Sequence, residues 1–129
     1  MEKKIYLLII FVVIVSFFSC SSRNALTEEK AIKAGEFVIN SYNNDPNKYG
    51  SYTPDYTIVS DKWIGLIQTS ETAAELRGQV HDQRRQRGIA KGKFNFIKST
   101  DGQWILDSYY FSGPGYFWSG ENVFYKVPN

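Results

Sequence analysis

Apolar residues between positions 26 and 43 recur every three or four residues, which is the spacing of an amphipathic helix. The apolar side of that helix would gather Ala31, Ala34, Gly35, Val38, Ile39 and Tyr42, with Ile32 at its margin. Thr27 stands in the N-cap position, and Glu29 precedes Lys33 by about one helical turn, the favourable order for an ion pair. The turn-forming run from 43 to 47 ends the pattern. We therefore expect a helix that lies on an apolar surface.

Beyond residue 50 the apolar positions begin to alternate with polar ones, which predicts β-strands. The segments with this pattern are 56–68, 74–82, 88–98 and 104–111, and a short edge strand is expected near 123–126. Asp101 and Gly102 form a strong hairpin signal before the last of the four main segments. An N-terminal amphipathic helix followed by about four strands predicts an α+β fold, with the helix packed on a curved antiparallel sheet.

A different apolar pattern, without breaks, stands near the beginning of the chain. Lys3 and Lys4 precede an apolar run from Ile5 that continues to Phe18, and Cys20, the only cysteine, follows the small Ser19. A charged region, an apolar region and a small residue before the cleavage site are typical of a secretory signal peptide. With the cysteine at the cut, the segment resembles the signal of bacterial lipoproteins. That resemblance implies a signal peptide over 1–19, a lipidated cysteine and tether over 20–26, and a single α+β domain over 27–129.

Two other interpretations of this segment stay open, a cleaved signal without lipid and an uncleaved anchor. The fourteen residues from Ile5 to Phe18 are fewer than the roughly 20 that a spanning helix needs. All three interpretations place the domain outside the cytoplasm. In enteric bacteria a residue other than Asp after the cysteine directs a lipoprotein to the outer membrane, and Ser21 stands there. The resemblance implies a chain anchored through acylated Cys20, facing the periplasm or the cell surface, with an envelope protein as a further partner.

Composition and charge narrow the classes of partner and cofactor. The single cysteine leaves no intramolecular disulfide, so stability must come from the core, to which an aromatic content of 16% can contribute large buried areas. Residues 71–98 hold seven Lys or Arg against three Asp or Glu, a net charge of +4, which is too weak to indicate nucleic-acid binding. His81 is the only histidine, so the sequence predicts neither a metal site nor a cofactor.

The strand from Gly92 to Phe96, the Asp101-Gly102 turn and the strand that begins at Trp104 resemble the cystatin-like and NTF2-like superfamily of small domains. The pattern lacks the additional helices of NTF2-like domains, so the resemblance implies a minimal, cystatin-like version. A small closed β-barrel with the helix as a plug is the alternative. Because the superfamily includes enzymes, ligand binders and interaction modules, the resemblance does not settle the function.

Few polar residues are candidates for catalysis or ligand binding. Asp107 is the one carboxylate inside an otherwise apolar strand, and alternation would place it on one face with Ile105, Tyr109 and Phe111, where it could line a concave cavity. His81 could act as a base oriented by Asp82, although neighbours in a strand point to opposite faces. The three arginines that follow could bind a carboxylate or phosphate, or keep a hairpin soluble: Arg84, Arg85 and Arg87. None of these is predicted to be catalytic.

Aromatic residues are dense near the end of the chain. Eight fall within seventeen residues: Tyr109, Tyr110, Phe111, Tyr116, Phe117, Trp118, Phe124 and Tyr125. Glycines and a proline interrupt them, which is consistent with a loop that presents Tyr116, Phe117 and Trp118 as a contact platform, with Trp118 the most exposed. The other interpretation is that these rings cap the core.

Three classes of function follow. The favoured one is a non-catalytic binding or interaction module tethered to the membrane. The second is a small-ligand carrier with an apolar cavity around Trp63, Phe96 and Trp104. The third is a hydrolase or isomerase that works through Asp107 and a second polar group.

Overall fold

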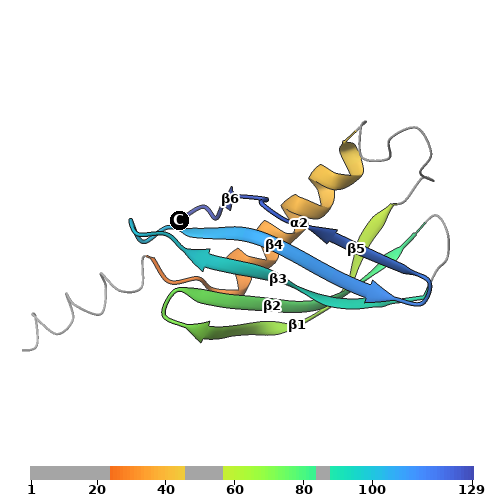
Figure 1. Cartoon of the computed structure of the whole chain (residues 1–129), viewed down its shortest axis with the longest axis horizontal. Helices are drawn as coiled ribbons and strands as arrows, with labels where there is room; N and C mark the ends of the chain where they lie inside the picture. The colour runs from red at the N-terminus through yellow and green to blue at the C-terminus, as the bar shows by residue number, and fades with distance from the viewer. Residues whose placement is uncertain (1–23, 46–56, 84–87) are drawn as a thin grey trace, which may run out of the picture.

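A computed structural model of the chain describes residues 24–45, 57–83 and 88–129. Its elements are α2 (Glu28–Asn44), β1 (Ile58–Ser70), β2 (Ala73–Asp82), β3 (Ala90–Lys98), β4 (Trp104–Gly113), β5 (Tyr116–Gly120) and β6 (Tyr125–Lys126). The strands form one antiparallel sheet in the order β1-β2-β3-β4-β5, and β6 also pairs with β4 (Figure 1). The predicted α+β class is confirmed, with six strands rather than about four. Cys20 and the segment 1–19 lie outside the described residues and stay predictions.

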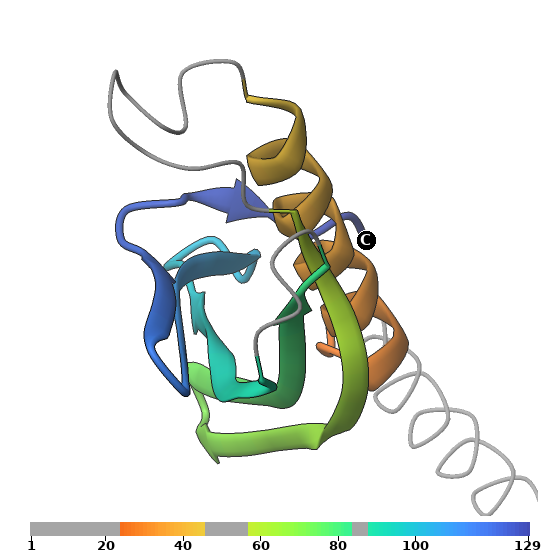
Figure 2. The ribbon, with the colours of Figure 1, turned by 90° about the vertical axis from the view of Figure 1, so that its right-hand side faces the viewer.

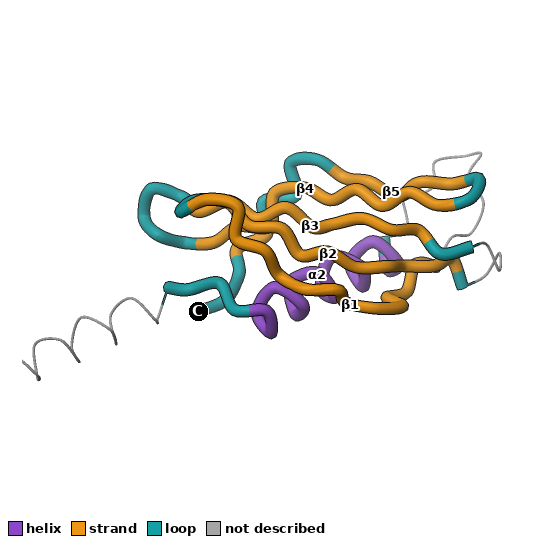
Figure 3. Tube along the Cα trace, turned by 90° about the horizontal axis from the view of Figure 1, so that it is seen from below, coloured by secondary structure: helices purple, strands orange, loops and turns teal. Residues whose placement is uncertain are grey.

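The sheet curls strongly, and α2 lies against its concave side next to β1 (Figure 2). Seen from below, the helix runs beside β1 and β2 (Figure 3). Its buried residues are Ala31, Ala34, Gly35, Val38 and Ile39, as its periodicity predicted. Gly35 permits close contact with the sheet, because a Cβ there would lie 3.0 Å from the ring of Phe94. Among the described residues no helix is long and apolar enough to cross a bilayer.

The ends of α2 form as the sequence predicts. The Thr27 hydroxyl accepts a hydrogen bond from the backbone N–H of Lys30 at 3.2 Å, which confirms the N-cap. Lys33 and Glu29 form an ion pair at 2.9 Å. At the other end the Asp45 backbone N–H donates to the carbonyl of Tyr42. The turn-forming residues beyond Asn44 therefore stop the helix where expected.

Aromatic rings fill the space between helix and sheet. Phe94 is fully buried, and its ring centroid lies 5.2 Å from that of Phe111 and 6.1 Å from that of Trp118. Phe96 is also fully buried, and Trp104 is only 6% exposed. Such packing is consistent with a domain that stabilises itself without a disulfide.

The side chain of Asn43 joins the helix to the start of β1. Its Nδ2 donates to the carbonyl of Ile58 at 2.6 Å, and its Oδ1 accepts from the Ile58 N–H at 2.9 Å. The side chain thus pairs with Ile58 as a neighbouring strand would. This contact fixes the C-terminal end of α2 against β1.

We expect Asn43→Ala to lower the free energy of unfolding by about 1–3 kcal/mol, because it leaves two partly buried backbone groups of Ile58 without their partner. The matched control is Asn44→Ala, which removes an exposed amide one residue later. Urea unfolding of both variants measures the difference. Equal losses would show that helix propensity, rather than the pairing with Ile58, sets the effect.

The alternation expected along β4 is wrong after Leu106. Trp104, Leu106, Tyr109 and Phe111 are the buried residues, so the period shifts by one. The cause is a β-bulge, since Ser108 pairs with Asn95 whereas Leu106 pairs with the next residue of β3. Asp107 is the extra residue at this bulge. The sequence predicted that Asp107 shares a face with Tyr109 and Phe111, and this prediction is wrong.

Hydrogen bonds fix the beginning of the described chain at a defined point of the domain. The indole N–H of Trp104 donates to the carbonyl of Asn24 at 3.0 Å. Close by, the Val127 N–H donates to the carbonyl of Trp104 at 2.9 Å, and the Gln103 side chain donates to the Val127 carbonyl at 2.9 Å. Both ends of the described chain therefore meet at the beginning of β4.

Candidate binding cleft

The segment between β5 and β6 runs along the edge of β4. The Val123 N–H donates to the carbonyl of Asp107 at 2.9 Å, and Tyr125 then pairs with Leu106. On the helix side, the ring of Phe37 stacks on that of Tyr125 with centroids 4.3 Å apart. The segment is thus held from both sides, by β4 and by α2.

A cleft of about 450 Å³ lies between this segment and α2. The lining residues are Phe37, Val38, Ser41, Tyr42, Asp45, Tyr109, Val123, Phe124 and Tyr125. Five of these nine are aromatic, so we call this site the aromatic cleft. Its volume matches that of ligand sites, about 300–1,000 Å³, but the aromatic cleft is widely open to solvent rather than enclosed.

Two rings of the aromatic cleft are unusually exposed for their size. Phe37 is 50% exposed and Phe124 is 61% exposed. Phe124 also has a backbone φ of 51°, in the left-handed region that costs a non-glycine residue about 1–2 kcal/mol. Because the ring is largely exposed, its burial offsets little of this cost. Such strained positions concentrate at functional sites, which favours a functional role for this cleft.

The floor of the aromatic cleft is continuous with the core. The ring centroid of Tyr109 lies 4.2 Å from that of Trp118, and Tyr42 meets the same indole edge-on at 5.5 Å. Burial raises the pKa of the Tyr109 hydroxyl above its ordinary value of 10.0. Tyr109 is therefore a neutral hydroxyl at neutral pH, and the floor is rigid because core packing supports it.

The described residues that line the aromatic cleft carry little formal charge. Asp45 is the one formally charged side chain among the described residues that line it. Ser41, Tyr42 and Asp45 stand at the C-terminal end of α2, whose last turn has no basic residue. The carbonyl groups at a helix C-terminus carry a partial negative charge, which here stays uncompensated by a cation of the helix.

The aromatic platform predicted from the sequence has a different structure. Residues 116–120 form the strand β5 rather than a loop, and their burial alternates. Trp118 is only 4% exposed, so the expectation that it is the most exposed ring is wrong. Tyr116 is buried and its hydroxyl donates to the carbonyl of Gly88 at 2.7 Å. Phe117, between them, is 70% exposed, because its side chain points away from the core.

Phe117 and Tyr116 also border a shallow depression of about 540 Å³ at the β4–β5 hairpin. A contact role for Phe117 therefore stays a prediction. Of the remaining candidates, Asp107 alone belongs to the described residues. Asp107 is half-buried at its bulge. The three arginines that could bind an anion or keep a hairpin soluble lie outside the described residues: Arg84, Arg85 and Arg87.

His81 and Asp82 follow the strand alternation and do not form a catalytic pair. Asp82 is fully buried on the inward face of β2, and its Oδ1 accepts from the Thr57 N–H at 3.4 Å. His81 is the next residue along the same strand and points to the other face. Across the described ranges no cluster of His, Cys, Asp and Glu has the arrangement of a metal site.

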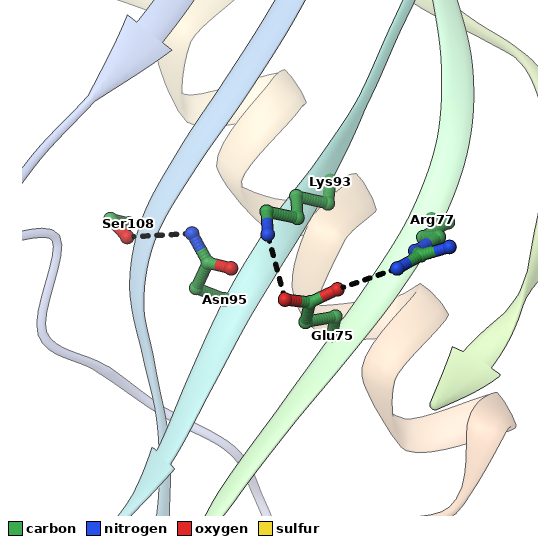
Figure 4. Close-up of polar contacts among 5 residues, drawn as sticks. All are labelled: Glu75, Arg77, Lys93, Asn95 and Ser108. Atoms are coloured by element: carbon green, nitrogen blue, oxygen red, sulfur yellow. Dashed lines mark hydrogen bonds and ion pairs between the residues drawn. The ribbon is translucent and has the colours of Figure 1, made fainter. Parts of the chain in front are cut away.

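Three charged residues of β2 and β3, Glu75, Arg77 and Lys93, form a polar network on the side of the sheet away from α2 (Figure 4). Glu75 lies between two cations, 2.7 Å from the Lys93 ammonium and 3.2 Å from the Arg77 guanidinium. Beside it, the Asn95 amide donates to the Ser108 hydroxyl at 3.0 Å. The Lys93 ammonium, helped by Arg77, holds the pKa of Glu75 below its ordinary value of 4.5, although burial opposes this effect. We interpret the network as a solvated face on which two cations flank one carboxylate.

Glu75 makes the stability of the domain depend on pH. A carboxylate with a lowered folded pKa stabilises the folded state above its unfolded pKa, and this contribution is lost as the pH falls through the folded value. We expect Glu75→Gln to be less stable than the wild type at about pH 7 and to approach it at about pH 3. Urea unfolding across this range is the measurement, with Glu29→Gln as the control for an exposed pair. A constant difference at all pH values would contradict the prediction.

Comparison of the chain with protein-family models, with curated proteins and with solved structures finds no match. The interpretation of the site therefore depends on its own geometry. Sequence reasoning missed Phe37 and Phe124 as site residues. The position of Phe37 carried a signal, since on the helical wheel it falls outside the apolar side and would present an aromatic ring to solvent.

Proposed function

We propose that this protein is a lipid-anchored binding module of the bacterial cell envelope and that the aromatic cleft is its binding site. The anchor is supported by the sequence around Cys20, which resembles a lipoprotein signal. The binding role is supported by a cleft of about 450 Å³ that lies between a helix and a segment paired with β4. The resemblance of the strand pattern to cystatin-like domains agrees with a small module of this kind.

The single observation that carries the binding role is the placement of Phe124. Its ring is 61% exposed at the cleft while its backbone adopts a left-handed conformation. A solvent-exposed ring on a strained backbone brings the folded domain little stability. A contact with a ligand or partner would account for the exposed ring of Phe124, because exposed aromatic side chains are frequent anchors of binding surfaces.

The polar groups of the aromatic cleft favour binding over catalysis. They are hydroxyls and one carboxylate: Ser41, Tyr42, Tyr109 and Asp45. The Tyr109 hydroxyl has a raised pKa, which makes it a weak acid for proton transfer at neutral pH. Such groups orient a ligand by hydrogen bonds without activating it.

The anchor is tested by replacing Cys20 with alanine in the full chain and following the incorporation of radiolabelled fatty acid in bacteria. We expect incorporation into the wild type and none into Cys20→Ala. Lipid on the variant would place the acylation elsewhere and overturn the assignment.

The cleft is tested by photo-crosslinking of the full chain in cells. A benzophenone amino acid replaces Ser41, an exposed residue of the cleft, or Lys91, an exposed residue of β3 outside it. We expect a discrete mass increase of the intact protein from position 41 and none from position 91. Equal labelling at both positions, or none at 41, would remove the cleft as the binding site.

A further inference from the structure

We propose that one end of the sheet, on the face away from α2, lies on the lipid surface and orients the domain there. The contact is made by a row of four residues that crosses β2, β3, β4 and β6, which we call the isoleucine row: Ala73, Ile97, Ile105 and Lys126. This inference rests on the lipid anchor of the proposed function, because the anchor brings this end of the sheet to the bilayer. It adds a second contact between protein and lipid.

Strand pairing puts the members of the isoleucine row side by side. Ile97 lies opposite Ala73 on one side and Ile105 on the other, and Ile105 lies opposite Lys126. Side chains that pair directly across a sheet point to the same face, with Cβ atoms about 4.5–5.5 Å apart. The residues next to them in β2, β3 and β4 are buried in the core: Ala74, Phe96 and Leu106. The row therefore points to the opposite face of the sheet.

The isoleucine row exposes apolar surface. Ile97 is 39% exposed, and Ile105 beside it is half-buried. Ile67 of β1, which is 44% exposed, pairs with Glu75 on the same face one pair farther along. A single exposed isoleucine needs no explanation, but three on one face of one end form a surface. Charged side chains border it, Lys126 on one side and Glu75 on another, as on proteins that lie in a membrane interface.

The length of chain between Cys20 and the domain indicates what covers this surface. The hydrogen bond from Trp104 holds Asn24, the first described residue, at the end of the sheet where β4 begins (Figure 1). Asn24 is four residues beyond Cys20, and four residues span at most about 14 Å. An acyl chain on Cys20 lies in the bilayer, so the start of β4 stays within this distance of the lipid surface. The isoleucine row begins there, because Ile105 follows Trp104.

Apolar area rather than charge carries the contact. The two turns at this end of the sheet hold Glu71 and Asp101, and the strands beside them hold Lys98 and Lys126. These four formal charges balance, so the contact does not require anionic lipid. The stem of Lys126 can lie along the apolar surface while its ammonium group stays in water among the headgroups.

Contact through the isoleucine row places the rest of the domain away from the lipid. Lys91 lies six residues before Ile97 in β3, which is about 20 Å along the strand, so it stays in water. The aromatic cleft lies between α2 and the segment that leads into β6, and α2 is on the other side of the sheet. The contact therefore leaves the cleft open to the aqueous side.

The test measures lipid contact at two isoleucines of similar exposure. A small fluorescent amino acid replaces Ile97 or, as the matched control, Ile89, which is 44% exposed just before the other end of β3. The acylated full chain is placed in phosphatidylcholine vesicles that contain lipid brominated near the headgroup end of its acyl chains, which quenches only at close approach. We expect quenching at position 97 to be about threefold or more that at position 89. Replacing part of the phosphatidylcholine with phosphatidylglycerol should leave it unchanged.

Each other outcome overturns the inference. Equal quenching at the two positions would mean that the isoleucine row does not orient the domain. A blue shift at position 97 without quenching would mean that a second copy of the chain covers the row. If mass spectrometry shows an acylated chain and position 97 is not quenched, the inference fails and the proposed function stands. If the chain carries no acyl group, the proposed anchor fails and the inference fails with it.

Variants locate the contact. Ile97→Thr keeps a β-branched side chain and removes apolar area, and Ile89→Thr makes the same change at the control position. With the fluorescent residue at Ala73 of the isoleucine row, we expect Ile97→Thr to lower quenching about twofold or more. Ile89→Thr should leave it unchanged. Circular dichroism checks that both variants fold, and equal quenching in the two folded variants would refute the contribution of the row.

Discussion

Trp118→Ala is expected to lower the free energy of unfolding by about 3–5 kcal/mol. The indole is 4% exposed and contacts rings from α2, β3 and β4. Its removal would leave a cavity between the helix and the sheet that these neighbours cannot close, because each ring is held by its own strand or helix. The loss is a large part of the stability of a domain of this size. Chemical denaturation followed by circular dichroism measures it.

The neighbouring residue provides the control for this prediction. Phe117 is a large aromatic residue of the same strand but is 70% exposed, so Phe117→Ala should change the free energy of unfolding by less than about 0.5 kcal/mol. The contrast between two adjacent rings tests the alternation of β5 directly. Similar effects of the two substitutions would mean that residues 116–120 do not form this strand.

Gly92→Ala is expected to cost about 3 kcal/mol or more, at the upper end of what overpacking costs. A Cβ at this position of β3 would overlap the carbonyl oxygen of Tyr110 and come to 2.6 Å from the Cα of Phe111. Both atoms belong to the backbone of the paired strand β4, so neither can rotate away. The substitution would separate β3 from β4 where Phe111 enters the core.

Gly115→Ala separates this steric effect from backbone conformation. Gly115 lies in the β4–β5 turn with φ of 74°, and a Cβ there would meet nothing within 4 Å. We expect a loss of only about 1–2 kcal/mol, the cost of a left-handed residue with a side chain. Thermal unfolding of the two variants side by side is sufficient. A larger loss at Gly115 than at Gly92 would show that the turn, rather than strand pairing, limits stability.

The helix and the main strands could be predicted because their periodicity is local and regular. The helix was expected over 26–43 and occupies Glu28–Asn44, and the strand expected over 74–82 occupies Ala73–Asp82. β5 was missed because three adjacent aromatic residues conceal the alternation of a strand. The bulge at Asp107 was missed because only the partner strand β3 reveals where the register shifts.

The candidate site was harder to predict, because its residues come together only in the folded chain. Phe37 and Tyr125 are far apart in the sequence and stack at 4.3 Å. The aromatic density near the end of the chain was recognised, but the sequence does not distinguish Trp118, which faces the core, from Phe124, which faces the cleft. In an irregular segment the direction of each side chain depends on the backbone conformation. The left-handed φ of Phe124 cannot be predicted from its residue type.

The hydrogen bond from Trp104 to Asn24 has a consequence for how the domain would stand on a membrane. It holds the beginning of the described chain beside the first turn of α2 and the last strand residues. The aromatic cleft lies towards the opposite end of the helix, which at 17 residues is about 25 Å long. A chain anchored through Cys20 would therefore carry its cleft outward, at a height above the lipid headgroups that lets it meet ligands arriving from the aqueous side.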